Sequence, residues 1–306
     1  MEPVDLSDVR RLYRDGVNVM DYLKKKLGAT HNTDQLVETA YDLQAGSYIE
    51  YIARHAAIEV PYQKDAADIL ASVLSNGDSI ADVGTGEMTT LSPVADACYG
   101  VVSSAFAIDI SLSRLIVGLR HLRETLPPTV CQKITAAAAT LFRLPLADNS
   151  VDVVWTSHAL EPNGGKELEG VSELARVTRK YLVLFEPSYE RNTTAGKDRM
   201  DRLGYVKDLE ATIASIPGLN LESVVKMSRP IDDPNPTYAH VVRKGPAKTS
   251  VVVALACPLT HGPLEARDGY LYSPRALLAY PVVENVPILR IEKGICASVL
   301  DAGPNP

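Results

Sequence analysis

From Pro61 onward, short apolar runs alternate with segments of helical periodicity, and this alternation limits the possible folds more than any other feature. The runs SIADVG, FAIDIS, VDVVWTSHAL and YLVLFEP are typical of strands. KDAADILASVL precedes them, and SRLIVGLRHLRETL and EGVSELARVTRK separate them, as helical patterns. Strands that alternate with helices form a parallel sheet with helices on both faces. The sequence therefore predicts an α/β fold with a mostly parallel sheet.

The end of this sheet is expected to differ from the rest. After the helical segment GYVKDLEATIASI, the runs LESVVKMSR and TYAHVVRK follow one another closely. Their connection is too short for a helical crossover, so we expect this pair to be antiparallel.

Segments on either side of the sheet suggest two further parts. Residues 1–62 have helical patterns, and Asn32 or Thr33 is a candidate cap for the helix that follows. Tyr41, Tyr48 and Tyr51 in this part fit either an amphipathic surface or a lid over a ligand. KGPAKTS is typical of a linker, and short β-like runs broken by Pro and Gly follow it. We expect a helical cap over 1–62, the sheet domain over 63–246, and a small β-rich module over 247–306.

Charge and composition exclude several classes of protein. The net charge of −7 over 306 residues gives no general attraction to nucleic acid or an anionic membrane. No run approaches the roughly 18 apolar residues of a membrane span, and the charged N-terminus lacks a signal core. The four cysteines form no CxxC pair, so neither a disulfide framework nor a complete zinc site is indicated. We expect a cytoplasmic protein.

The residues that follow the strands are the candidate ligand contacts, because ligands of open parallel sheets bind beyond the carboxyl ends of the strands. Gly84 and Gly86 in DVGTGE allow a tight turn and a close approach to a ligand, although GxG alone is a weak signal. Asp109 ends the run FAID, where an acid accepts ribose hydroxyls or caps the next helix.

Three motifs together resemble a known family. DVGTGE, AIDIS and LPLADNSVDVVWTSHALEP, in this order and spacing, resemble class I S-adenosylmethionine-dependent methyltransferases over roughly residues 65 to 245. The resemblance implies a Rossmann-like fold with S-adenosyl-L-methionine as cofactor. It assigns cofactor contacts to the loop of Asp82, Gly84, Thr85 and Gly86, to Asp109 at the ribose, to Thr140 and Leu141 beside the adenine, and to Ser157 near the transferred methyl group.

The chain departs from the family pattern in two places. Glu87 and Met88 replace the usual small residues after the glycines, and Thr140 stands where many members have an acid for the adenine amino group. These departures leave open a non-catalytic binding or scaffold protein. An NAD enzyme is disfavoured because the third glycine of its fingerprint is missing.

Methyl transfer to a hydroxyl needs a group that removes a proton, and a base with a pKa near neutral suits this task. His158 follows the strand VDVVWTS and is the first candidate, with a packed core histidine as the structural alternative. Glu161 either contacts substrate or caps a helix, and Glu186 follows the next strand. We therefore expect catalytic roles for His158, Glu161 and Glu186, and substrate contacts from Asn163, Tyr189 and Tyr48.

No metal is expected. Asp148 and Asp152 read as solvated residues of the turn before a strand.

The C-terminal CP, GPL, AYPV and VPIL resemble zinc-ribbon proteins that activate translation-factor and tRNA methyltransferases. Of the zinc ligands only Cys257 remains, with Thr260 at its CxxC partner position, so we expect a metal-free module. This module would stabilise the structure, recognise substrate or form a homodimer.

The resulting prediction is a methyltransferase that acts on an O or N atom of a polar small molecule. A looser resemblance of TSHALEPNGGKELEG and the residues after it, to methyltransferases encoded with surface-polysaccharide enzymes, suggests a sugar or nucleotide-sugar. Protein or tRNA as acceptor stays open because of what the C-terminal module resembles.

Overall fold

The computed structural model describes residues 5–29, 32–228, 235–245 and 253–300. Within these residues the centre is a seven-stranded sheet of order β3-β2-β1-β4-β5-β7-β6. The strands are β1 (Ser79–Val83), β2 (Ser104–Asp109), β3 (Ile134–Ala138), β4 (Val151–Ser157), β5 (Thr178–Pro187), β6 (Leu219–Lys226) and β7 (Thr237–Lys244). The first five in the order pair in parallel, and β7 is antiparallel to both β5 and β6. This confirms the mostly parallel sheet and the antiparallel end. Strand β3 was not identified from the sequence.

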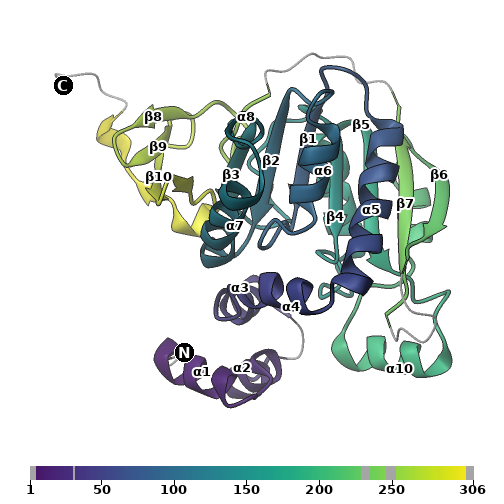
Figure 1. The fold of residues 1–306 in the computed structure, drawn as a ribbon. Coiled ribbons are helices and arrows are strands. Elements are labelled where there is room, and N and C mark those ends of the chain that lie inside the picture. Colours follow the sequence, from purple (N-terminus) through teal and green to yellow (C-terminus); the bar gives the residue numbers. More distant parts are fainter. Residues whose placement is uncertain (1–4, 30–31, 229–234, 246–252, 301–306) are drawn as a thin grey trace.

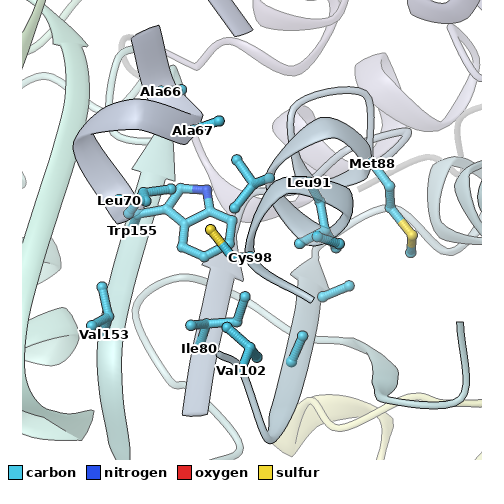
Figure 2. Packing of buried hydrophobic residues seen from close by; sticks show 14 of the residues in the cluster. Ala66, Ala67, Leu70, Ile80, Met88, Leu91, Cys98, Val102, Val153 and Trp155 are labelled. Atoms are coloured by element: carbon cyan, nitrogen blue, oxygen red, sulfur yellow. The ribbon is translucent and has the colours of Figure 1, made fainter. Parts of the chain in front are cut away.

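Helices cover both faces of this sheet (Figure 1). They are α5 (Ala56–Val73), α6 (Leu91–Cys98), α7 (Leu112–Thr125), α8 (Pro128–Cys131), α9 (Glu167–Val177) and α11 (Leu209–Ser215). Helix α10 (Thr194–Leu203) lies beyond one end of the sheet (Figure 1). Side chains of α5, α6 and α7 pack on one face around Trp155, which lies at the centre of the cluster in Figure 2. Those of α9 and α11 pack on the other face around Val154. Neighbouring strand residues therefore point to opposite cores, which is why the strands read as continuous apolar runs.

The N-terminal part consists of short helices at one end of the sheet (Figure 1): α1 (Leu6–Arg14), α2 (Val19–Leu27), α3 (Asp34–Asp42) and α4 (Ser47–Arg54). Thr33 is the cap of α3, since its hydroxyl accepts the Leu36 N–H at 3.3 Å. Val9, Leu23 and Leu36 contribute to a separate small core. Helix α5 runs through the expected boundary at residue 62, so that division stays a prediction.

The C-terminal module packs against β3, at the edge of the sheet (Figure 1). It contains β8 (Glu265–Arg267), β9 (Tyr270–Ser273), β10 (Leu278–Val283), β11 (Val286–Pro287) and β12 (Ile295–Cys296). Backbone hydrogen bonds join it to the sheet domain, from Leu289 to Ala138 and from Ala256 to Pro145, both at 2.8 Å. Most of the expected linker lies outside the described residues.

The prediction that Asp152 is a solvated turn residue was wrong. Asp152 lies within β4 and is 1% exposed. Its carboxylate accepts the Ser79 N–H at 3.0 Å and pairs with Arg179, so a buried ion pair explains an acid within an apolar strand. Asp148 does lie in the turn, and its side chain is exposed, as expected.

In the part of the chain that the structure describes, no helix combines the length and apolarity that crossing a membrane requires.

Candidate active site

The glycine loop after β1 has a backbone that other residues adopt with strain. Gly84 has φ +78°, and a Cβ added there would lie 2.2 Å from Ala159 Cβ. Gly86 has φ +54°, and a Cβ there would lie 2.5 Å from Arg114 Nη2. The loop thus needs glycine both for its turn and for its close neighbours.

Glu87 and Met88, the unusual residues of this loop, have structural partners. The buried carboxylate of Glu87 accepts the backbone N–H groups of Gly46, Tyr48 and Ile49 at 3.0, 3.4 and 2.9 Å. These are the free donors at the start of α4, so Glu87 caps that helix from another segment. Met88 is buried in the core, beside Gly118 of α7. The departures from the family pattern therefore attach the loop to its surroundings.

Asp109 ends β2 and fixes the loop. One carboxylate oxygen accepts the Gly86 N–H and the other accepts the Ser111 N–H, both at 2.8 Å. The side-chain cap of α7 is Ser111, not Asp109, because the Ser111 hydroxyl accepts the Arg114 N–H.

Asp82 lies at the end of β1 and is 1% exposed. Oδ2 accepts the Thr85 hydroxyl at 2.7 Å, whereas Oδ1 is buried without a hydrogen-bond partner. Burial raises the pKa of Asp82 to about 7, and the charge of Asp109 adds to this increase. Asp82 can therefore accept a hydrogen bond from a ligand or, when ionised, form an ion pair with a positively charged group of the ligand.

Two adjoining cavities open at the carboxyl ends of the strands. The smaller cavity has a volume of about 120 Å³. It is lined by five of the predicted cofactor contacts, which are Gly84, Asp109, Thr140, Leu141 and Ser157. The larger, of about 680 Å³, is lined by Asp82 and Thr85 together with residues of α4, α5 and the segment after β4. Gly84, Ser157 and His158 line both cavities.

His158 lies where the two cavities meet, in left-handed backbone with φ +57°. Nδ1 is hydrogen-bonded to the Glu161 carboxylate, and Nε2 lies 3.2 Å from the Thr237 hydroxyl. Burial opposes ionisation of Glu161, but the charge of His158 and hydrogen bonds from His158, Tyr205 and Asn235 outweigh burial and lower the pKa of Glu161. An ionised carboxylate on one imidazole nitrogen orients the ring and stabilises its protonated form.

Residues 81–183 match the protein-family model described as a methyltransferase domain. The chain contains a methyltransferase domain. Residues 254–285 match the Trm112p-like protein family. Both matches confirm the resemblances expected from the sequence.

A solved structure shares the fold of the methyltransferase domain. Magnesium protoporphyrin IX methyltransferase from Synechocystis PCC 6803, with bound SAH, is 17% identical, with a TM-score of 0.53 over 70% of this chain and 100% of that chain. A SAM dependent methyltransferase from Aquifex aeolicus is 17% identical, with a TM-score of 0.43 over 59% of this chain and 90% of that chain. A comparison with curated proteins gave no match.

Glu186 of the methyltransferase domain lies beneath the site and does not line either cavity. It is fully buried, and its carboxylate accepts hydrogen bonds from the Thr156 hydroxyl at 2.7 Å and from the backbone N–H groups of residues 159–161 at 3.0–3.1 Å. Burial raises the pKa of Glu186 to about 7, against the opposite effect of His158 and these donors. Its position supports the segment after β4 and is not one for contact with substrate.

The predicted substrate residues divide among three places. Tyr48 lines both cavities. Asn163 lines the smaller cavity, where its amide donates to the Ala159 carbonyl at 3.0 Å. Tyr189 lines neither cavity, and its hydroxyl donates to Asp201 at 3.2 Å.

Sequence reasoning missed several residues that line the cavities. Arg114 of α7 lines both cavities, and Asp34 of α3 lines the smaller one. Tyr41 of α3, one of the tyrosines of the lid alternative, also lines both cavities. Tyr62 of α5 lines the larger cavity, and its hydroxyl is 2.7 Å from that of Ser157. The tyrosines of the N-terminal helices carried a signal in the sequence, which the lid alternative used, whereas Arg114 carried none.

In the Trm112p-like module, Cys257 is a buried free cysteine. Its Sγ lies 3.5 Å from the Tyr280 hydroxyl. Burial opposes ionisation of the thiol, but hydrogen bonds from Ser273, Thr260 and Tyr280 lower the pKa of Cys257. Among the described residues, no three His, Cys, Asp or Glu side chains are grouped closely enough to hold a metal.

Proposed function

We propose that the protein transfers the methyl group of S-adenosylmethionine to an O or N atom of a polar small molecule, with His158 as the general base. The observation that carries this proposal is the position of His158, at the meeting point of two cavities and hydrogen-bonded to Glu161.

The residues of the smaller cavity fit the nucleoside part of S-adenosylmethionine. Asp109 suits the ribose hydroxyls, and Thr140 and Leu141 flank the space for adenine. Asp34 lines the same cavity and is a candidate partner for the adenine amino group, where Thr140 replaces the usual acid. Asp82 Oδ1 has no hydrogen-bond partner among the described residues and is a candidate contact for the ammonium group of the methionyl part.

The cofactor, when bound, supplies an electrophilic methyl group on a sulfonium. The protein then has to align the acceptor and remove its proton. His158 accepts this proton at Nε2, since Nδ1 is held by Glu161. The Thr237 hydroxyl is buried beside Nε2 and has to release this nitrogen before it takes the proton.

The larger cavity supports a small, polar acceptor. Its lining includes five tyrosines, and Glu59, Arg54 and Arg199 are charged. A cavity of about 680 Å³ has the size of a small-molecule site and is too small for a folded RNA. The names of the similar structures give no support to a sugar or nucleotide-sugar, and this finer prediction is not carried forward.

Binding and turnover test the proposal. Calorimetry should show binding of S-adenosylhomocysteine and none of NAD. Methyl-labelled S-adenosylmethionine, incubated with the protein and fractionated metabolite extract, should label a small molecule. Binding without any labelled product would favour the scaffold alternative. Label in protein or tRNA would favour the macromolecular acceptor that the Trm112p-like module suggests. The cytoplasmic location, the homodimer and the absence of metal remain predictions.

A further inference from the structure

Arg114 is a buried cation whose guanidinium has no hydrogen-bond acceptor among the described residues. The residue is 8% exposed and lies in the first turn of α7. Among the described residues, no acceptor makes a hydrogen bond with its guanidinium, and Nε is buried without a partner. The nearest carboxylate oxygen, Oε1 of Glu87, lies 3.8 Å from Nε, and the Glu87 carboxylate already accepts three backbone N–H groups. Buried donors without acceptors are unfavourable, so an acceptor from a ligand is expected.

The guanidinium is held in place by aromatic rings. Its central carbon lies 4.4 Å from the ring centroid of Tyr48 and 5.2 Å from that of Tyr41. Cation–π contacts fix a guanidinium without using its N–H donors. The five donors of the planar fork therefore remain available to an anion, for which a carboxylate is a geometric match.

The position of Arg114 indicates that this anion belongs to the cofactor and not to the substrate that accepts the methyl group. Nη2 packs on Gly86, in the loop that begins at Asp82. Arg114 and Asp82 both line the larger cavity, and Asp82 Oδ1 also lacks a partner. A guanidinium without a hydrogen-bond acceptor and a carboxyl oxygen without a donor, both lining the larger cavity, match the carboxylate and ammonium of an α-amino acid.

We propose that Arg114 binds the carboxylate of the methionyl part of S-adenosylmethionine. This inference rests on the proposed function, and it names a contact that the glycine loop does not provide. Two neighbouring elements thus contact the cofactor, β2 at the ribose through Asp109 and α7 at the carboxylate through Arg114. Tyr41 of α3 and Tyr48 of α4 position the guanidinium for this contact.

The test compares three ligands by calorimetry: S-adenosylhomocysteine, decarboxylated S-adenosylmethionine, and 5′-methylthioadenosine. Only the first has the carboxylate. Arg114→Gln should weaken binding of S-adenosylhomocysteine by roughly 10- to 100-fold, the range of a charge-assisted hydrogen bond. Binding of the other two should stay within about threefold of the wild type. Arg114→Lys, which keeps the charge but not the fork, should restore part of the affinity and covers the case in which Arg114→Gln fails to fold. Arg120→Gln, an exposed arginine on the same helix, is the matched control and should leave all three unchanged.

Two results would overturn the inference alone. Unchanged binding of S-adenosylhomocysteine to Arg114→Gln would indicate that Arg114 binds an anionic group of the methyl-accepting substrate instead. Equal weakening of all three ligands would mean that Arg114 only shapes the cavity. Failure of the wild type to bind S-adenosylhomocysteine would instead overturn the proposed function, and this inference with it.

Discussion

The carboxylate of Glu87, in the glycine loop, accepts a 2.9 Å hydrogen bond from the backbone N–H of Ile49 in α4. The N–H groups of Gly46 and Tyr48 converge on the same carboxylate. A helix of the N-terminal part is therefore capped by the loop that forms the floor of the candidate active site. Binding in the loop and docking of α4 should depend on one another.

Removal of this cap should release α4. Glu87→Ala leaves three backbone donors without their acceptor and should lower the free energy of unfolding by about 1 to 3 kcal/mol. Hydrogen exchange should become faster in residues 47–54, and affinity for S-adenosylhomocysteine should fall. Glu124→Ala, an exposed glutamate on α7, is the control. Unchanged exchange in α4 of Glu87→Ala would contradict the coupling.

His158→Asn should reduce turnover about 10²- to 10⁴-fold, the usual contribution of a general base. Affinity for S-adenosylhomocysteine and thermal stability should change little, because the asparagine amide overlaps imidazole Nδ1 and can still donate to Glu161. Glu161→Gln should give a smaller loss, since the imidazole remains but its carboxylate partner does not. His121→Asn, on α7 and outside both cavities, is the control. A folded His158→Asn protein with near-normal turnover would rule out the base role.

Asp109→Ala should affect both cofactor affinity and stability. The variant loses any ribose contact and also the two hydrogen bonds to the Gly86 and Ser111 N–H groups. We expect at least about a tenfold weaker binding of S-adenosylhomocysteine and a free energy of unfolding lower by about 1 to 3 kcal/mol. Calorimetry and chemical denaturation measure the two effects separately. Lost stability with normal affinity would limit Asp109 to a structural role.

The raised pKa of Asp82 predicts a pH-dependent stability of the ligand-free protein. The folded protein retains the Asp82 proton up to about pH 7. The unfolded chain loses it near pH 3.9, so between these values stability falls as pH rises, by up to about 1.4 kcal/mol per pH unit. Asp82→Asn removes this loss. Chemical denaturation should show the variant gaining stability relative to the wild type from about pH 4 to about pH 7, with no further gain above. A difference that does not vary with pH would contradict the assignment. Glu186 also titrates near pH 7, but it is present in both proteins and cancels in the comparison.

The C-terminal module is tied to α3 by an ion pair that should contribute to stability. Arg290 is 4% exposed and pairs with Glu38 of α3. Glu38→Gln leaves the buried guanidinium with less compensation and should lower the free energy of unfolding by about 1 to 3 kcal/mol. Glu50→Gln removes an exposed ion pair with Arg54 instead, and should change it by about 0.5 kcal/mol or less. Equal effects of the two variants in thermal denaturation would show that the ion pair contributes no more than a surface pair.

Most of the sheet could be predicted because strands buried on both faces contain continuous apolar runs rich in strand-forming residues. β1, β2, β4 and β5 each contain such a run. Strand β3, with the sequence ITAAA, ends in three alanines, which favour a helix. Its alanines form a strand because β2 pairs with it on one side and the C-terminal module covers the other, and neither contact is local in sequence.

The candidate site was predictable where residues follow strands. Gly84, Asp109 and His158 come together because the carboxyl ends of parallel strands share one edge. Glu186 follows the same rule, yet its side chain turns inward because the N–H groups of residues 159–161 need an acceptor. Arg114 escaped prediction because its environment is made by tyrosines of distant helices.

The pairing of Ala138 with Ile288 and Leu289 has a consequence for how this protein can be divided. β3 is an edge strand of the sheet, and the C-terminal module covers it and the side chain of Ala137. Exposed edges with free backbone groups pair with the edges of other molecules. A fragment that ends before residue 253 should therefore self-associate instead of remaining a monomeric catalytic domain. The module would therefore prevent aggregation through the edge strand β3, in addition to any role in function.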